Sequence, residues 1–232
     1  MIIIIIGILL VFIGMWYFYN NQQQMSWESA YNPLSQDEKF QVDTYPRYTN
    51  NGYALISFPK NIKRELINFW KSNQQYKTPE TQLPKDFLWG SKNSGPIITN
   101  TLILQDYNKH LYDVVILTCK NLCEKWVNRN DLTFKALYGI REYKRGAILK
   151  MHVDKKDTHI ISVIIHIDKK VDKDWPLVVF DPDIKKEKKI FLDDNIDCVL
   201  YEGARIIHGR PYEFFGDSYA NLFVHFSTTD FS

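Results

Sequence analysis

Residues 143–154 read YKRGAILKMHVD, and residues 204–210 read ARIIHGR. Alternate side chains of an extended strand share a face, so His152 and Asp154 can converge on one ion. Two histidines and one carboxylate form the facial triad that holds non-haem Fe(II) and leaves coordination positions open. These segments therefore predict a strand-borne metal site built from His152, Asp154 and His208.

A second His-x-Asp pair, His166 and Asp168, has a different context. It ends the apolar run 160–167 and opens a charged loop at 168–174. This pattern is typical of the end of a buried core strand. We interpret His166 as a hydrogen-bonded structural residue, whereas the pair at 152–154 follows a glycine turn and precedes a polar loop, as expected at the mouth of a barrel.

Hydrophobic periodicity predicts helices first and strands afterwards. Apolar residues recur at helical spacing over 59–72 and 107–127. After residue 130 the pattern changes to about eight short strands separated by turn signals. The expected strands are 133–143, 148–153, 160–167, 177–180, 189–192, 198–201, 204–208 and 219–227. The predicted fold class is α+β, with a double-stranded β-helix (jelly-roll) core and N-terminal supporting helices.

At these residues the chain resembles the Fe(II)- and 2-oxoglutarate-dependent dioxygenases, within them the prolyl 4-hydroxylase-like branch. The resemblance covers residues 137–226 well and residue 53 onward more loosely. Beyond the metal motifs, it rests on the Tyr143-x-x-Gly146 lead-in, Ser162 where the family often has Thr, the segment 175–180 in place of a Gly-Gly-x-Thr-x-Phe strand, the Gly203 turn and Gly216.

This resemblance implies a hydroxylase. His152, Asp154 and His208 would be the catalytic metal ligands, with Fe(II) as the metal, 2-oxoglutarate as co-substrate and ascorbate as an optional further cofactor. The implied reaction is hydroxylation of a substrate C–H bond. By the same resemblance the substrate is a peptidyl proline, so the expected partner is a protein or peptide, although no residue of the sequence identifies it.

Two positions depart from the family pattern. The branch has a Lys about ten residues after the distal His, where this chain has Ser218, and a Tyr three residues before the first ligand, where it has Leu149. A buried dianion needs a cation or several donors. Strand parity places Arg210 on the face of His208, and Lys150 on that of His152. The expected co-substrate residues are Arg210, Lys150, Ser162, Ser218 and Tyr143; the alternative for Arg210 is a surface residue at a strand end.

The N-terminus predicts a membrane anchor. Residues 2–19 contain no charge, and eighteen residues span about 27 Å as a helix. Trp16, Tyr17 and Tyr19 at its end suit a bilayer interface. A cleaved signal peptide is the alternative, but no Lys or Arg precedes the run and no Ala-x-Ala site follows it. We expect a single-pass protein with an N-terminal signal anchor; the side of the membrane stays undetermined.

Composition sets the remaining expectations. The predicted organisation is an anchor at 1–19, a polar stalk at 20–48 and one domain at 49–232. A net charge of +2 argues against nucleic-acid binding. Of the three cysteines, Cys119 and Cys123 are four apart on an expected helix, which does not favour a disulfide, and Cys198 starts an apolar strand.

Two other functions fit parts of the pattern. The departures at Ser218 and Leu149 would suit a non-catalytic jelly-roll binding module with a decayed metal site. A metal-dependent hydrolase could use the same ligands with another metal, but the sequence places no general-base carboxylate near them.

Overall fold

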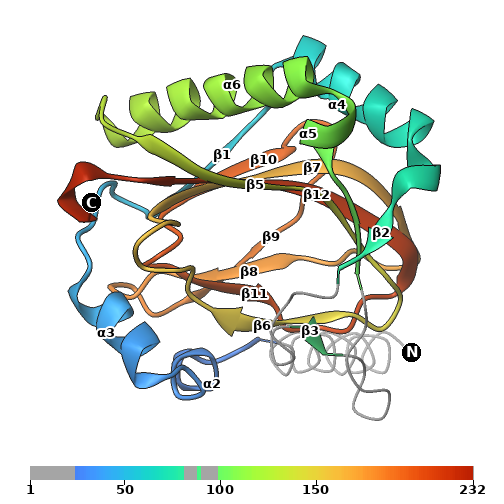
Figure 1. Cartoon of the computed structure of the whole chain (residues 1–232). Helices are drawn as coiled ribbons and strands as arrows, with labels where there is room; N and C mark the ends of the chain where they lie inside the picture. Colours follow the sequence, from blue (N-terminus) through green and yellow to red (C-terminus); the bar gives the residue numbers. More distant parts are fainter. Residues whose placement is uncertain (1–23, 81–87, 90–98, 232) are drawn as a thin grey trace, which may run out of the picture.

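The computed structural model describes residues 24–80, 88–89 and 99–231. Two antiparallel sheets face each other, and two helices cover the outer face of the larger sheet (Figure 1). The larger sheet has the strand order β1-β10-β7-β12-β5-β4-β2, and the smaller sheet has the order β3-β6-β11-β8-β9. This arrangement confirms the α+β class with a jelly-roll-like core.

The strands expected after residue 130 are all present; 133–143, 177–180 and 198–201 have the predicted bounds, and the others have shifted ends. The larger sheet contains β1 (Tyr53–Ile56), β2 (Thr78–Pro79), β4 (Asn100–Leu102), β5 (Thr133–Tyr143), β7 (Ile161–Val171), β10 (Cys198–Tyr201) and β12 (Gly216–Ser227). The smaller sheet contains β3 (Leu88–Trp89), β6 (Ile148–His152), β8 (Leu177–Phe180), β9 (Glu187–Ile190) and β11 (Ile207–Arg210). Among the described residues before 130, four short strands were not predicted.

Strand β7 is buried on both faces, which explains its continuous apolar run. Val163, Ile165 and Ile167 belong to the core beneath the helices, while Ile164 belongs to the core between the two sheets. Side chains alternate along a strand, so both sets can be apolar only when both faces are covered. On the same face as Ile164, β7 also carries Ser162, whose hydroxyl contacts Asp154.

Two long helices supply the cover over the larger sheet (Figure 1). Helix α4 (Lys60–Ser72) buries Leu66 and Trp70, and α6 (Lys109–Val127) buries residues at helical spacing. Cys119 and Cys123 lie on the buried face of α6, and Cys198 is equally buried on β10; all three thiols are free. Short elements complete the set: α5 (Leu104–Tyr107) and the 3-10 helices η1 (Gln74–Tyr76) and η2 (Thr229–Phe231).

The segment expected to be a polar stalk differs from the prediction. Helices α2 (Trp27–Tyr31) and α3 (Gln36–Thr44) occur within it and pack against the smaller sheet (Figure 1). Ala30, Leu34 and Val42 form a core cluster with apolar residues of β8 and β11. Spaced apolar residues hidden among polar ones are sufficient for this contact, so the domain begins before residue 49. We call residues 24–52 the N-terminal arm.

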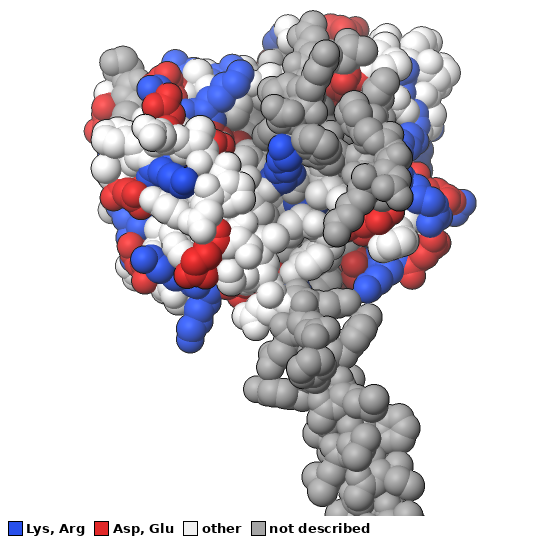
Figure 2. All heavy atoms as spheres, turned by 90° about the horizontal axis from the view of Figure 1, so that it is seen from below, with Lys and Arg blue, Asp and Glu red and all other residues white. Residues whose placement is uncertain are grey.

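The predicted anchor at residues 1–19 lies outside the described residues. Within residues 24–80, 88–89 and 99–231, no helix has the length and apolar content needed to cross a bilayer. The face shown in Figure 2 carries basic and acidic residues interspersed among uncharged ones. A continuous basic surface, which nucleic-acid binding favours, does not cover the described part of this face.

Candidate metal centre

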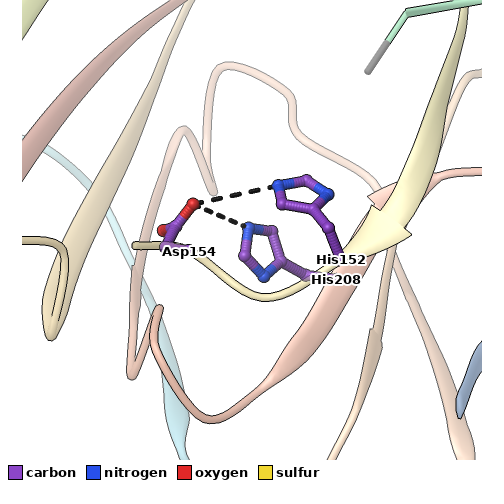
Figure 3. Close-up of side chains that lie close together, drawn as sticks. All are labelled: His152, Asp154 and His208. Atoms are coloured by element: carbon purple, nitrogen blue, oxygen red, sulfur yellow. Dashed lines mark ion pairs between the residues drawn. The ribbon is translucent and has the colours of Figure 1, made fainter. Parts of the chain in front are cut away.

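The structure brings His152, Asp154 and His208 together (Figure 3). His152 ends β6, Asp154 follows it in a loop, and His208 lies opposite His152 on the neighbouring strand β11. The Asp154 Oδ1 atom is 3.8 Å from His152 Nε2 and 3.6 Å from His208 Nε2. One ligand atom from each residue lies within 4.8 Å of the others, so the three can bind a single ion.

Backbone carbonyls orient both imidazoles. His152 Nδ1 is 2.8 Å from the carbonyl oxygen of Lys150, and His208 Nδ1 is 2.8 Å from that of Ile206. A carbonyl only accepts, so each Nδ1 carries a proton, and Nε2 is the ring nitrogen that faces Asp154 and would bind a metal ion. A hydrogen bond from the far nitrogen is the usual support of a metal-bound histidine.

The charge states also suit a cation. Burial, together with the neighbouring His208, lowers the pKa of His152 to about 3, so its imidazole is neutral at neutral pH. Burial opposes ionisation of Asp154, but the neighbouring histidines, His208 foremost, outweigh it and hold the pKa of this carboxyl well below its usual range. Two imidazole nitrogens and one carboxylate form the donor set of a facial Fe(II) site.

The second carboxylate oxygen of Asp154 accepts a hydrogen bond from a side chain outside the triad. The Ser162 hydroxyl donates to Asp154 Oδ2 at 3.1 Å, and Ser162 Oγ is 2.8 Å from His225 Nδ1. Gly203 leaves the space for this arrangement, since a Cβ there would come within 2.4 Å of Asp154 Oδ2. Oδ1 is therefore the oxygen that faces the two histidines.

A β-bulge corrects the prediction for Lys150. His208 pairs with His152, but Arg210 pairs with Leu149, so β6 contains one residue more than β11 between the two pairs. The additional residue reverses strand parity. Leu149 therefore lines the same cavity as His152, while Lys150 points outward and is exposed.

The triad lies in a cavity of about 620 Å³ between the two sheets. Arg210 and Tyr143 line it as expected, and both side chains are buried. Arg210 stacks over Trp175 and Tyr219 and donates through Nη1 to the Trp175 carbonyl, but its buried Nη2 has no partner. The buried Tyr143 hydroxyl also lacks a hydrogen bond of good geometry, with the Arg141 guanidinium as a charged neighbour.

Two other predicted co-substrate residues do not line this cavity. Ser162 is fully buried behind Asp154, where its hydroxyl is already engaged. Ser218 lies on β12 opposite Lys170 and is half-buried at the far end of that strand. Of the five residues expected to bind the co-substrate, the structure gathers Arg210 and Tyr143 beside the triad. It places Lys150, Ser162 and Ser218 elsewhere.

The sequence reasoning missed an aromatic wall on the Asp154 side of the cavity. His159 and His225 stack with ring centroids 3.8 Å apart, and Tyr138 contacts both rings. The Tyr138 hydroxyl is 3.1 Å from His159 Nε2. His225 pairs with Ser162 across β12 and β7. The alternation Asn221, Phe223, His225 was the available signal for its inward orientation.

An ion pair, also missed, lines another part of the cavity. The Arg141 guanidinium binds Glu80 through two bonds of 2.7 and 2.6 Å. The Glu80 carboxylate also accepts from the hydroxyls of Thr99 and Thr101. A bidentate pair with this many partners is a fixed part of the wall rather than a free cation.

Comparisons with known proteins find similarity in structure but not in sequence. Neither a family model nor a curated protein sequence matches the chain. A prolyl-4-hydroxylase from Pseudomonas putida superposes with a TM-score of 0.57 at 14% identity, covering 77% of this chain and 94% of that one. The chain has the fold of the Fe(II)- and 2-oxoglutarate-dependent oxygenases.

Two further structures with this oxygenase fold contain relevant ligands. HygX from Streptomyces hygroscopicus, with nickel and 2-oxoglutarate bound, gives a TM-score of 0.54 at 11% identity and covers 84% of this chain and 88% of that one. EctD from S. alaskensis, with bound Fe, gives 0.53 at 10% identity over 81% and 80%. At these identities the similarity establishes the fold alone.

Proposed function

We propose that the chain is an Fe(II)- and 2-oxoglutarate-dependent oxygenase that hydroxylates a substrate C–H bond. The observation that carries the proposal is the convergence of His152, Asp154 and His208, with both Nε2 lone pairs and one carboxylate oxygen directed at the same point. The oxygenase fold supports it independently.

The triad would hold the metal, and the cavity would hold the organic ligands beside it. Bound iron would use O2 as the oxidant, with 2-oxoglutarate as the co-substrate that is oxidised alongside, to hydroxylate a C–H bond. The chain itself contributes orientation and exclusion of water: His152 and His208 are fixed by carbonyls, and apolar side chains such as Leu177 and Phe223 line the same cavity.

Arg210 is the proposed partner of the far carboxylate of 2-oxoglutarate. Its Nη2 is a buried donor without a partner, and the Tyr143 hydroxyl is a second unsatisfied donor of the same cavity. A buried donor left unpaired costs free energy, which an incoming carboxylate would recover. Arg210 can thus replace the lysine that the prolyl 4-hydroxylase-like branch has where this chain has Ser218. Ascorbate remains a prediction from that resemblance.

The test is an anaerobic titration of the full-length chain with Fe(II) and 2-oxoglutarate. We expect the weak visible charge-transfer band of the chelated complex in the wild type. Arg210→Met should need about 10- to 100-fold more 2-oxoglutarate to develop the band, the range expected when a hydrogen-bonded charge partner is lost.

Lys150→Met is the matched control, because it removes a cation from the outer face of the neighbouring strand. It should titrate as the wild type does. Iron binding without the band in the wild type would favour the non-catalytic binding module. An Arg210→Met curve identical to that of the wild type would assign the carboxylate to another residue.

A peptidyl proline is the proposed substrate. The support is the resemblance to the prolyl 4-hydroxylase-like branch and the similarity to a prolyl-4-hydroxylase. Proline-containing peptides should stimulate succinate formation and gain 16 mass units by mass spectrometry, an oxygen atom per turnover. Succinate formation without hydroxylation of any proline peptide in a library, together with hydroxylation of another class of compound, would contradict the proposed substrate.

Membrane anchoring by residues 2–19 is also a proposal, supported by their uncharged, apolar sequence. The full-length chain should remain in the membrane fraction after carbonate extraction, whereas a chain lacking residues 1–19 should be released. Release of both would reject the anchor without bearing on the metal centre.

A further inference from the structure

The N-terminal arm reaches the metal centre through one buried side chain. Gln41 lies on α3 and is only 5% exposed. Its Nε2 donates to the carbonyl oxygen of Asp154 at 2.9 Å and to that of Ala204 at 3.0 Å. Both protons of one amide are therefore used on two backbone segments more than forty residues apart in the chain.

These two segments carry the metal ligands. The first contains Asp154 itself. The second is the turn that leads into β11, where the Ile206 carbonyl orients the imidazole of His208. A backbone bond from Asp154 N to the Gly203 carbonyl, 2.8 Å long, joins the same two segments directly. Gln41 joins the same two segments a second time, through their carbonyl oxygens, and is not among the residues that line the cavity.

Other residues of the arm hold the same turn. Glu202 accepts from the backbone N–H and the hydroxyl of Thr49, each at 2.8 Å, and its own N–H donates to the Gly52 carbonyl at 2.9 Å. Arg47 of the arm and Arg205 of the turn both pair with Asp183. The arm thus contacts the turn at Glu202 and Ala204 and shares the partner Asp183 with Arg205; of these contacts, those of Gln41 also include the proposed ligand Asp154.

Helix α3 is held in place at its first turn and by its packing, and this fixes the position of Gln41. A capping box between Ser35 and Glu38 begins the helix, and Val42 anchors it in the core cluster on the smaller sheet. A glutamine buried beside such packing normally costs free energy unless both its donors are satisfied. Here the two carbonyls satisfy them, so the amide has a fixed geometry.

We infer that Gln41 is a positioning residue of the metal centre, which sets the separation between the segment bearing Asp154 and the turn preceding His208. The inference rests on the proposed metal binding. It assigns to the arm a role in iron affinity: supports behind metal ligands are typically worth about 10- to 100-fold in metal affinity.

The test is anaerobic Fe(II) titration by calorimetry of the full-length chain without 2-oxoglutarate, together with thermal unfolding of the metal-free protein. Gln41→Met keeps the side-chain volume and removes both donors. It should weaken Fe(II) binding at least about tenfold. Gln36→Met, the same substitution at an exposed position of the same helix, should bind Fe(II) as the wild type does.

Val42→Ala separates positioning from stability. It loosens the packing of α3 but leaves the two carbonyl contacts, so it should lower the unfolding temperature without changing the Fe(II) affinity. A merely structural role for Gln41 would make Gln41→Met behave like Val42→Ala. If Gln41→Met does not fold, Gln41→Asn, whose amide is one methylene too short for both carbonyls, decides the same question.

Wild-type affinity in Gln41→Met, or an equal loss in Val42→Ala, overturns the inference and leaves the proposed function intact. Failure of the wild type itself to bind Fe(II) would instead reject the proposed function.

Discussion

At the scale of single residues, Gly203 is the position where an added methyl group should disturb the metal centre most directly. A Cβ would lie 2.4 Å from Asp154 Oδ2 and 2.6 Å from Ser162 Oγ. We predict that Gly203→Ala displaces the carboxylate and lowers Fe(II) affinity by about 10- to 100-fold. Calorimetric titration measures this directly.

Ala204→Gly is the control for Gly203→Ala, because it changes the neighbouring residue of the same turn by the same methyl group in the opposite sense. It should retain the Fe(II) affinity. Undiminished binding in Gly203→Ala would show that the carboxylate can move aside without cost.

His166 is a buried, hydrogen-bonded residue, as predicted for the second His-x-Asp pair. Its Nδ1 is 3.1 Å from Asn221 Oδ1. Burial lowers its pKa from 6.5 to about 4. Between these values the unfolded chain binds a proton that the folded chain does not, so stability falls as the pH is lowered from 6.5 to 4.

We predict that His166→Asn reduces the slope of unfolding free energy against pH in this window. The slope should be about 1.4 kcal/mol per pH unit smaller than in the wild type. Urea unfolding at pH 6, 5.5 and 5 gives the slopes. His110→Asn removes an exposed imidazole on α6 and is the control. A slope in His166→Asn equal to that of the wild type would contradict the predicted burial effect.

The convergence of the three candidate metal ligands could be predicted from the sequence, because residue type and spacing are tied to the chemistry of such a site. The surrounding residues could not be predicted equally well. Lys150 was placed on the cavity face by strand parity, but the bulge in β6 depends on pairing with β11, a contact distant in the chain. Ser162 lies on the predicted strand, but it does not face the co-substrate cavity as expected. Its hydroxyl donates to Asp154 instead.

At the scale of elements, the long strands and helices followed from periodicity, because each buries a wide apolar face. The short strands β2 and β3 and the helices of the arm did not, since they carry few apolar residues and depend on tertiary contacts. Propensity is a weak guide in such segments, where packing decides the conformation.

Helix α6 offers a paired test of its buried face. Leu111 is 1% exposed, whereas Leu117 on the same helix is 60% exposed. Leu111→Ala should cost about 2–5 kcal/mol of unfolding free energy, from lost burial and the cavity left behind. Leu117→Ala should change it by less than about 0.5 kcal/mol. Chemical denaturation of both variants checks the orientation of the helix. Equal losses of unfolding free energy in the two variants would show that the helix does not bury the face described.

For the whole molecule, metal binding and folding should be linked. The proposed ligands come from two strands and a loop that are assembled only in the folded chain, so Fe(II) should bind the native state selectively. At a free concentration 100 times Kd, the metal should add about 2.7 kcal/mol of stability. For a domain of this size the melting temperature should rise by about 5–10 °C.

His208→Ala should abolish this metal-dependent rise, and chelation should reverse it in the wild type. Scanning calorimetry under anaerobic conditions, with and without Fe(II), provides the comparison. A rise of the same size in His208→Ala would mean that the ion stabilises the protein from another place.

The three buried thiols have a practical consequence. Burial raises the pKa of Cys119, Cys123 and Cys198, so each is both shielded and protonated at neutral pH. Maleimide reagents need an accessible thiolate. A single cysteine introduced on the surface of the native protein, for example at Gln36 on the arm, would therefore accept a spin label or fluorophore without a cysteine-free background. Distances between the arm and the jelly roll could then be followed as the protein takes up its ligands.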